Sequence, residues 1–308
     1  MSNDPNQPSY AAAVGPTVLL FCDDPARRAE LAAAIAEAGG RVAASEPLAE
    51  ALARLDGQLT AGGVVVEVVE DGGAMLDTLL AHLDAAAATM RFSSVITIPH
   101  ALIDVAAARI ADERAQLLVE PDDGELAAAL VEMLGTAGGG VRDNANEANS
   151  RRLAQLSEEV GRIARTLAAL SGDEGAVREP AAALRLAGGS GESASDGAMA
   201  RAILRLRRLR DQHFNSALFA DPAWDMLLDL TAARHERRPV AVSSLCIAAA
   251  VPATTALRWI GTMTDHGLLA RHPDPDDGRR VFIALTERAA GAMAAYCASA
   301  RRVLEPAA

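Results

Sequence analysis

Residues 241–286 read AVSSLCIAAAVPATTALRWIGTMTDHGLLARHPDPDDGRRVFIALT and decide how the last third of the chain folds. The pattern predicts a short helix, a turn, a second helix, and two strands joined by a charged turn. Ser243 and Ser244 are suitable caps for the first helix. The second helix is expected from Pro252 to His266, because a proline without an N–H is tolerated in the first helical turn. This order of elements is a winged helix-turn-helix, which places one helix in the major groove of DNA.

The two strands and the turn between them form the wing. Gly267 suits a left-handed cap at the end of the second helix. Residues 268–269 open the first strand, and residues 274–278 make the turn. Apolar residues alternate at positions 281, 283 and 285, which is typical of a returning strand.

This segment resembles the DNA-binding domain of the multiple-antibiotic-resistance-regulator (MarR) family. The resemblance depends on HGLLAR (266–271), DPDDGRR (274–280) and ALTERAAGAM (284–293), which keep the family's order and spacing. It implies a MarR-like winged-helix domain over residues 198–308, with a recognition helix in the major groove and a wing tip in the minor groove. The candidate DNA-contacting residues are Ser243, Ser244, Pro252, Thr254, Thr255, Arg258, Arg279 and Arg280.

A plainer interpretation stays open for some of these residues. Arg258 and Arg280 are also compatible with solvated side chains, and Asp276 and Asp277 with a role in shaping the turn. The arginine-rich run at 201–214 fits a phosphate-contacting helix or a solvated helix that leads into a dimer interface.

The charge is distributed unevenly along the chain. The net charge of −12 over 308 residues argues by itself against a nucleic-acid partner. Residues 200–308, however, hold 15 arginines and 11 acidic residues, whereas residues 1–199 hold 14 arginines and 30 acidic residues. A basic end (net +4) that faces phosphate and an acidic front part (net −16) fit this split.

Composition favours a two-domain cytoplasmic, nucleoid-associated protein. The chain has no apolar window of membrane-spanning length, and its polar start is unlike a signal peptide. Cys22, Cys246 and Cys297 lie far apart among apolar neighbours, which suits reduced, buried thiols. No nucleophile–base set or metal-ligand spacing appears, so we expect neither an enzyme nor a cofactor.

Residues 16–136 alternate between apolar strands and alanine-rich helical stretches. Strands are predicted at 17–22, 41–45, 62–69, 93–98 and 116–120. Five strand–helix units of this length predict a doubly wound parallel sheet, in which functional groups lie at the carboxyl ends of the strands.

This region resembles the receiver domain of two-component response regulators, by pattern more than by motif. A receiver needs an acidic pair, an aspartate that accepts phosphate, a hydroxyl and a lysine. The corresponding positions hold Asp23, Asp24, Glu67, Pro99 and Glu120. The extra methylene of Glu67 mis-sets in-line transfer, and Glu120 repels an acyl phosphate instead of neutralising it. We therefore expect a pseudo-receiver that is not phosphorylated; Asp23 and Asp24 are also compatible with a simple helix N-cap.

Residues 145–171 are predicted to form a coiled-coil helix between the two domains. Apolar residues follow the 3–4 spacing of an a/d seam, which favours a parallel homodimer, although docking on the protein's own domains stays open. Flexible segments are expected at 1–15 and 172–197. The seam residues are Leu153, Leu156, Val160, Ile163, Leu167 and Leu170.

Three functions remain after this reading. The first is a dimeric transcription factor that binds double-stranded DNA and whose front domain senses through a regulatory protein. The second is a protein-interaction adaptor whose winged helix no longer binds DNA. The third is a phosphorylated response regulator, against which the missing acceptor, hydroxyl and lysine argue.

Overall fold

The computed structural model describes residues 15–57, 61–137, 195–214 and 219–304. By their contacts, the residues divide into two compact units, Met1–Pro99 with Asp112–Gly139 and His100–Ala111 with Gly140–Ala308. The predicted coiled coil over 145–171, with its seam from Leu153 to Leu170, lies outside the described residues. So does most of the predicted linker over 172–197, and the homodimer therefore stays a prediction.

The first unit contains a five-stranded parallel sheet in the order β2-β1-β3-β4-β5. This confirms the predicted doubly wound sheet and all its strands. Parallel pairing places the carboxyl ends of the strands at one edge, where the candidate phospho-site residues were expected. The strands are β1 Thr17–Phe21, β2 Arg41–Glu46, β3 Gly63–Glu67, β4 Ser94–Ile98 and β5 Ala115–Val119.

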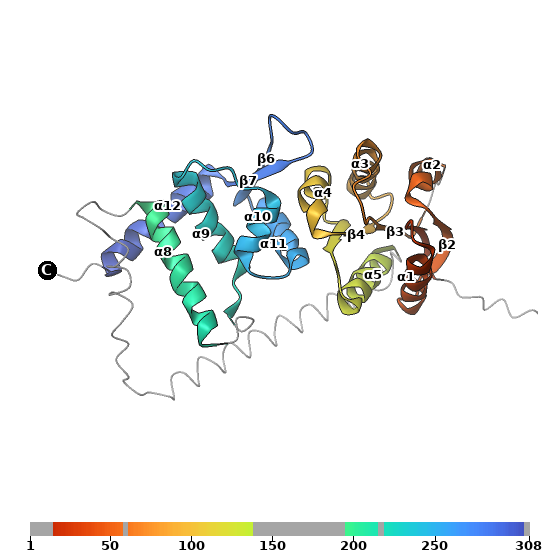
Figure 1. Ribbon diagram of the computed structural model, residues 1–308, viewed down its shortest axis with the longest axis horizontal. Helices are drawn as coiled ribbons and strands as arrows, with labels where there is room; N and C mark the ends of the chain where they lie inside the picture. Colours follow the sequence, from red (N-terminus) through yellow and green to blue (C-terminus); the bar gives the residue numbers. More distant parts are fainter. Residues whose placement is uncertain (1–14, 58–60, 138–194, 215–218, 305–308) are drawn as a thin grey trace, which may run out of the picture. The chain divides into compact units, whose positions relative to one another are not determined.

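Helices follow each strand in the chain. They are α1 Pro25–Glu37, α2 Ala51–Asp56, α3 Ala74–Ala88, α4 Ile103–Arg109 and α5 Asp123–Ala137, with 3-10 turns at Leu48–Glu50 and His100–Leu102. The apolar faces of α1 and α5 pack against one face of the sheet, in a core that includes Val65, Val95 and Leu130. Figure 1 shows α3 on the other side of the sheet. Coverage on both faces explains why the central strands are almost continuously apolar.

The second unit is a helical domain with a two-stranded hairpin. Its elements are α8 Asp196–Leu209, a 3-10 turn at Arg210–Gln212, α9 Pro222–His235, α10 Val242–Ala249, α11 Ala253–Asp265, β6 Leu269–Pro273, β7 Val281–Leu285 and α12 Glu287–Leu304. The hairpin is antiparallel, and Leu269 pairs with Leu285 at its base. This arrangement of α10, α11, β6 and β7 confirms the predicted winged helix-turn-helix (Figure 1).

Two details of the helix-turn-helix differ from the prediction. Helix α10 begins one residue before Ser243 and has no side-chain cap, so the expected serine cap is wrong. The turn after α10 uses Ala250 at a φ of 52°, a left-handed conformation that no glycine announces in the sequence. The cap expected at Gly267 is confirmed, with a φ of 65°.

Among the described residues, no single helix is long and apolar enough to cross a membrane. Helices α10 and α11 would meet the length and composition test only if they were joined across a bend of 107°.

Candidate functional site

Helix α11 has a buried face and an outer face. Ala256, Ile260 and Met263 are buried and hold the helix on the domain. On the outer face, Arg258 is exposed and Trp259 retains 39% of its accessible surface. Thr255 is half-buried beside them. The face available to a ligand thus combines a cation, an indole ring and a hydroxyl, and Trp259 is a member that the sequence reasoning missed.

Thr254 does not belong to this outer face. Its exposure is only 6%, so its side chain is not available to a DNA groove, and the expectation for this residue is wrong. The tight turn at Ala250 brings α10 close to the first turn of α11, which covers a side chain that the helical pattern alone leaves at the surface.

The remaining candidates near the turn are accessible to different degrees. Ser244 on the first turn of α10 is exposed, whereas Ser243 is half-buried. Pro252 is exposed and flanks the start of α11.

The wing tip is shaped by aspartates. The Asp274 carboxylate accepts a hydrogen bond from the backbone N–H of Asp276 at 2.9 Å, and the Asp277 carboxylate accepts one from the N–H of Arg279 at 2.9 Å. These bonds fold the turn and leave the Arg280 side chain exposed and that of Arg279 half-buried. The structure therefore places two arginines at the tip, while neighbouring aspartates have a structural role.

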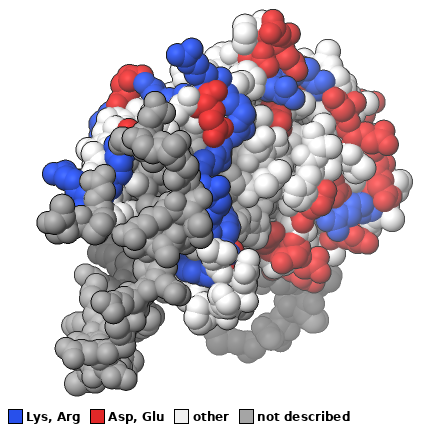
Figure 2. All heavy atoms as spheres, turned by 60° about the vertical axis from the view of Figure 1, so that its left-hand side comes forward, with Lys and Arg blue, Asp and Glu red and all other residues white. Residues whose placement is uncertain are grey.

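Helix α8 has less free charge than its sequence suggests. Arg201 donates to Asp229 at 2.6 Å and to Glu236 at 3.0 Å, and this pairing lowers the pKa of Glu236. Arg207 and Arg208 both contact Asp225, whereas Arg205 is exposed. Most arginines of this run therefore stabilise the domain internally. Figure 2 shows basic side chains gathered on part of the face in view, and acidic side chains over much of the rest.

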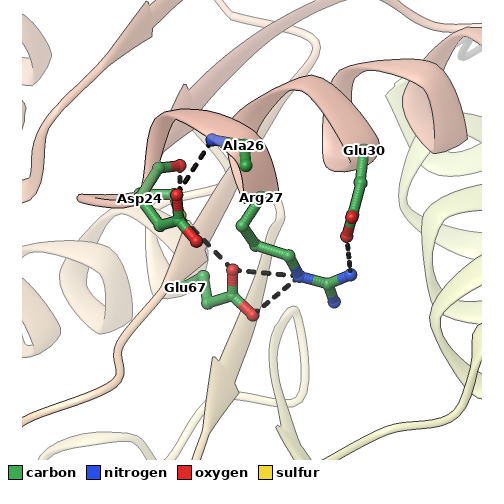
Figure 3. A network of polar contacts seen from close by, with 6 residues as sticks. Asp24, Ala26, Arg27, Glu30 and Glu67 are labelled. Carbon is green, nitrogen blue, oxygen red and sulfur yellow. Dashed lines mark hydrogen bonds and ion pairs between the residues drawn. The ribbon is translucent and has the colours of Figure 1, made fainter.

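At the carboxyl edge of the sheet, the acidic pair is engaged by the backbone. Asp24 caps α1 by accepting a hydrogen bond from the N–H of Ala26 at 2.9 Å (Figure 3). Asp23 accepts one from the N–H of Leu48 at 2.8 Å. Both carboxylates thus do the work of ordinary caps and turns.

Glu67, at the end of β3, is held by a side chain that the sequence reasoning missed. Arg27 on the first turns of α1 places its Nε 3.1 and 3.2 Å from the two carboxylate oxygens of Glu67 (Figure 3). The same guanidinium donates to Glu30 at 2.9 Å. The Cys22 thiol donates to Glu67 at 3.3 Å, and burial together with this bond raises the pKa of Cys22 to about 11. The only advance signal was the i, i+3 spacing of Arg27 and Glu30.

The other two receiver positions lie at the same edge. Pro99 directly follows β4, and Glu120 directly follows β5 with a φ of 45° and an exposed side chain. Within the described ranges, no cluster of three or more His, Cys, Asp or Glu side chains is arranged to hold a metal ion. The edge is thus built around an internal ion pair.

Comparison with known proteins agrees with the second unit. A family model described as a winged helix DNA-binding domain matches residues 225–289. No curated protein matched the chain.

Solved structures with a likeness to the chain include several regulators. A probable transcriptional regulator from Pseudomonas aeruginosa is 29% identical and covers 33% of this chain and 76% of its own, with a TM-score of 0.23. The transcriptional regulator Tm0710 from Thermotoga maritima is 21% identical over 33% and 69%, with a TM-score of 0.23. BpsR from Bordetella bronchiseptica, whose DNA binding is regulated by 6-hydroxynicotinic acid, is 19% identical over 34% and 75%, with a TM-score of 0.22. TM-scores of this size do not establish a shared overall fold.

The family match spans α11, the hairpin and the helices that support them, and the exposed face of α11 lies inside it. The second unit therefore contains a winged helix domain of the DNA-binding kind, and the protein is a DNA-binding regulator.

Proposed function

We propose that the protein is a dimeric, MarR-like transcriptional regulator that reads duplex DNA with α11 and the wing. The observation that supports this best is the outer face of α11, where Thr255, Arg258 and Trp259 stand over a buried apolar stripe. A helix of this form presents base- and phosphate-contacting groups to the major groove. Arg279 and Arg280 at the wing tip suit a narrow, negative minor groove.

Dimerisation is part of the proposal. The 3–4 spacing of the seam from Leu153 to Leu170 supports it at the sequence level. On α12, Tyr296 and Val303 retain 42% and 84% exposure, and exposed apolar groups of this size suit an interface. Two tethered winged helices gain affinity for a two-fold site through effective concentration.

The parallel-sheet unit is proposed to act without phosphorylation. Asp23 and Asp24 accept backbone hydrogen bonds, and Glu67 is neutralised by Arg27, so the groups that would hold magnesium and accept phosphate are already engaged. Regulation would then come from a partner protein that binds this unit.

The DNA-binding part is tested by titrating the full-length protein into a duplex selected from a randomised library, at several salt concentrations. Arg258→Ala should lower affinity about 5- to 100-fold if it reads a base. Arg280→Ala should flatten the salt dependence by about one phosphate contact. Arg54→Ala is the matched control, because it removes the same charge from an exposed side chain of the first unit. A wild-type protein that selects no preferred duplex would favour the adaptor function instead.

The phosphorylation part is tested by incubation with acetyl phosphate and magnesium. Mass spectrometry should detect no added phosphoryl group, and DNA affinity should not change. A phosphoryl group localised to Asp23, Asp24 or Glu67 would overturn this part of the proposal. The dimer part is tested by Leu156→Asp with Ile163→Asp, which should lower both the mass in light scattering and the DNA affinity.

A further inference from the structure

A buried carboxylate joins α8 to α9 in the second unit. Asp225 on α9 is only 2% exposed, and a carboxylate buried to this degree needs compensating partners. Two consecutive residues of α8 supply them. Arg207 donates through Nε to one carboxylate oxygen, and Arg208 places Nη2 3.1 Å from the other.

Arg208 also reaches a third helix. The same Nη2 donates to the carbonyl oxygen of Ala248 in the last turn of α10, at 2.7 Å. One guanidinium therefore contacts α8, α9 and α10 at a single point. Arg207, by contrast, has its second carboxylate contact at the start of α9, 3.7 Å from Asp221.

The Ala248 carbonyl needs a donor from outside its own helix. The last carbonyls of a helix have no intrahelical N–H partner. The residue four positions further on is Pro252, which has no N–H at all. A guanidinium at the C-terminal end of a helix satisfies such a carbonyl and is also favoured by the helix dipole.

This contact lies where α10 turns into the recognition helix. Three residues, Ala250 to Pro252, separate α10 from α11, and Ala250 adopts its left-handed conformation there. A side chain that holds the end of α10 against α8 and α9 therefore constrains the direction in which α11 leaves the turn.

We propose that Arg208 is a positioning residue for DNA recognition: it fixes the α10–α11 turn relative to α8 and so sets the orientation of α11 in the groove. The proposal rests on the proposed DNA-reading function. It assigns to Arg208 a role in sequence discrimination and not in phosphate contact. A displacement of α8 relative to α9 would then be transmitted directly to the reading helix.

The test compares Arg208→Met with Arg205→Met in the full chain. Both variants remove one positive charge from α8, but Arg205 is exposed on that helix. Two duplexes serve as probes: one selected by the wild type from a randomised library, and one of the same composition with scrambled sequence. Because Arg207 still pairs with Asp225, we expect Arg208→Met to fold, and tryptophan-monitored urea unfolding checks this at the assay temperature.

Arg208→Met should lose about tenfold or more of the preference for the selected duplex, the size expected for one charge-assisted hydrogen bond. Its salt dependence should match the wild type, because no phosphate contact is removed. Arg208→Lys, which keeps a donor near the Ala248 carbonyl, should restore part of the preference. Arg205→Met should retain the preference.

Two results would overturn the proposal. One is an Arg208→Met variant with wild-type preference. The other is an equal loss on both duplexes with a flatter salt dependence, which would identify Arg208 as a phosphate contact. A wild type that prefers no duplex would instead refute the proposed function on which the role of Arg208 rests.

Discussion

Replacing Arg27 by methionine leaves the Glu67 carboxylate at the end of β3 without its counter-charge. The side chain of Glu67 is 16% exposed and that of Arg27 is 31% exposed, so the pair is neither buried nor fully solvated. Exposed pairs contribute about 0–1 kcal/mol, and breaking a buried pair costs about 3–5 kcal/mol. The first unit should therefore lose about 1–3 kcal/mol of unfolding free energy.

The two tryptophans make this loss measurable in the intact chain. Trp224 and Trp259 both lie in the second unit, so tryptophan fluorescence follows that unit, whereas far-UV circular dichroism follows both. Urea unfolding of Arg27→Met should show an earlier transition by circular dichroism and an unchanged one by fluorescence. Arg54→Met is the matched control, since Arg54 is 41% exposed and 3.9 Å from Glu46, and it should shift stability by less than about 0.5 kcal/mol.

A second substitution tests the reason for the loss. Glu67→Gln removes the carboxylate charge but keeps an oxygen that accepts from Arg27. In the double variant no uncompensated charge remains, so most of the loss caused by Arg27→Met should be recovered. If the two single effects simply add, the ion pair does not stabilise the edge of the sheet and the reasoning is refuted.

Four further outcomes are expected from the described residues. Leu130→Ala, at a fully buried position between α5 and the sheet, should cost the first unit about 2–5 kcal/mol by circular dichroism, and a smaller loss would mean that the core collapses around the cavity. Ala250→Gly should stabilise the second unit by about 1 kcal/mol in tryptophan-monitored urea unfolding, because the left-handed conformation is strained for alanine; a destabilised variant would contradict this. All three cysteines are buried and burial raises their pKa, so the native protein should resist a thiol-specific reagent at pH 8 and react only when unfolded; rapid reaction of the native protein would count against this. The pKa of Glu236 is lowered by Arg201, so its stabilisation is complete above its usual pKa and is lost as the pH falls through the lowered value; Glu236→Gln should flatten the acid side of the stability profile, and an unchanged profile would exclude this contribution.

The sequence by itself determined the elements and their order. Apolar runs predicted the five strands, and the spacing around Pro252 and Gly267 predicted α11 and its end, because these signals depend on periodicity and on local backbone preferences. The wing was predictable for the same reason, since alternation and a polar turn are local features.

Only the tertiary structure decided which side chains meet. Arg27 and Glu67 are 40 positions apart, as are Arg208 and Ala248, and no local pattern connects either pair. Thr254 is buried because α10 folds back against the start of α11, which a helical pattern does not contain. Periodicity assigns a residue to a face of its own element, whereas burial, ion pairing and the capping of a helix end depend on the neighbour that packing brings to that face.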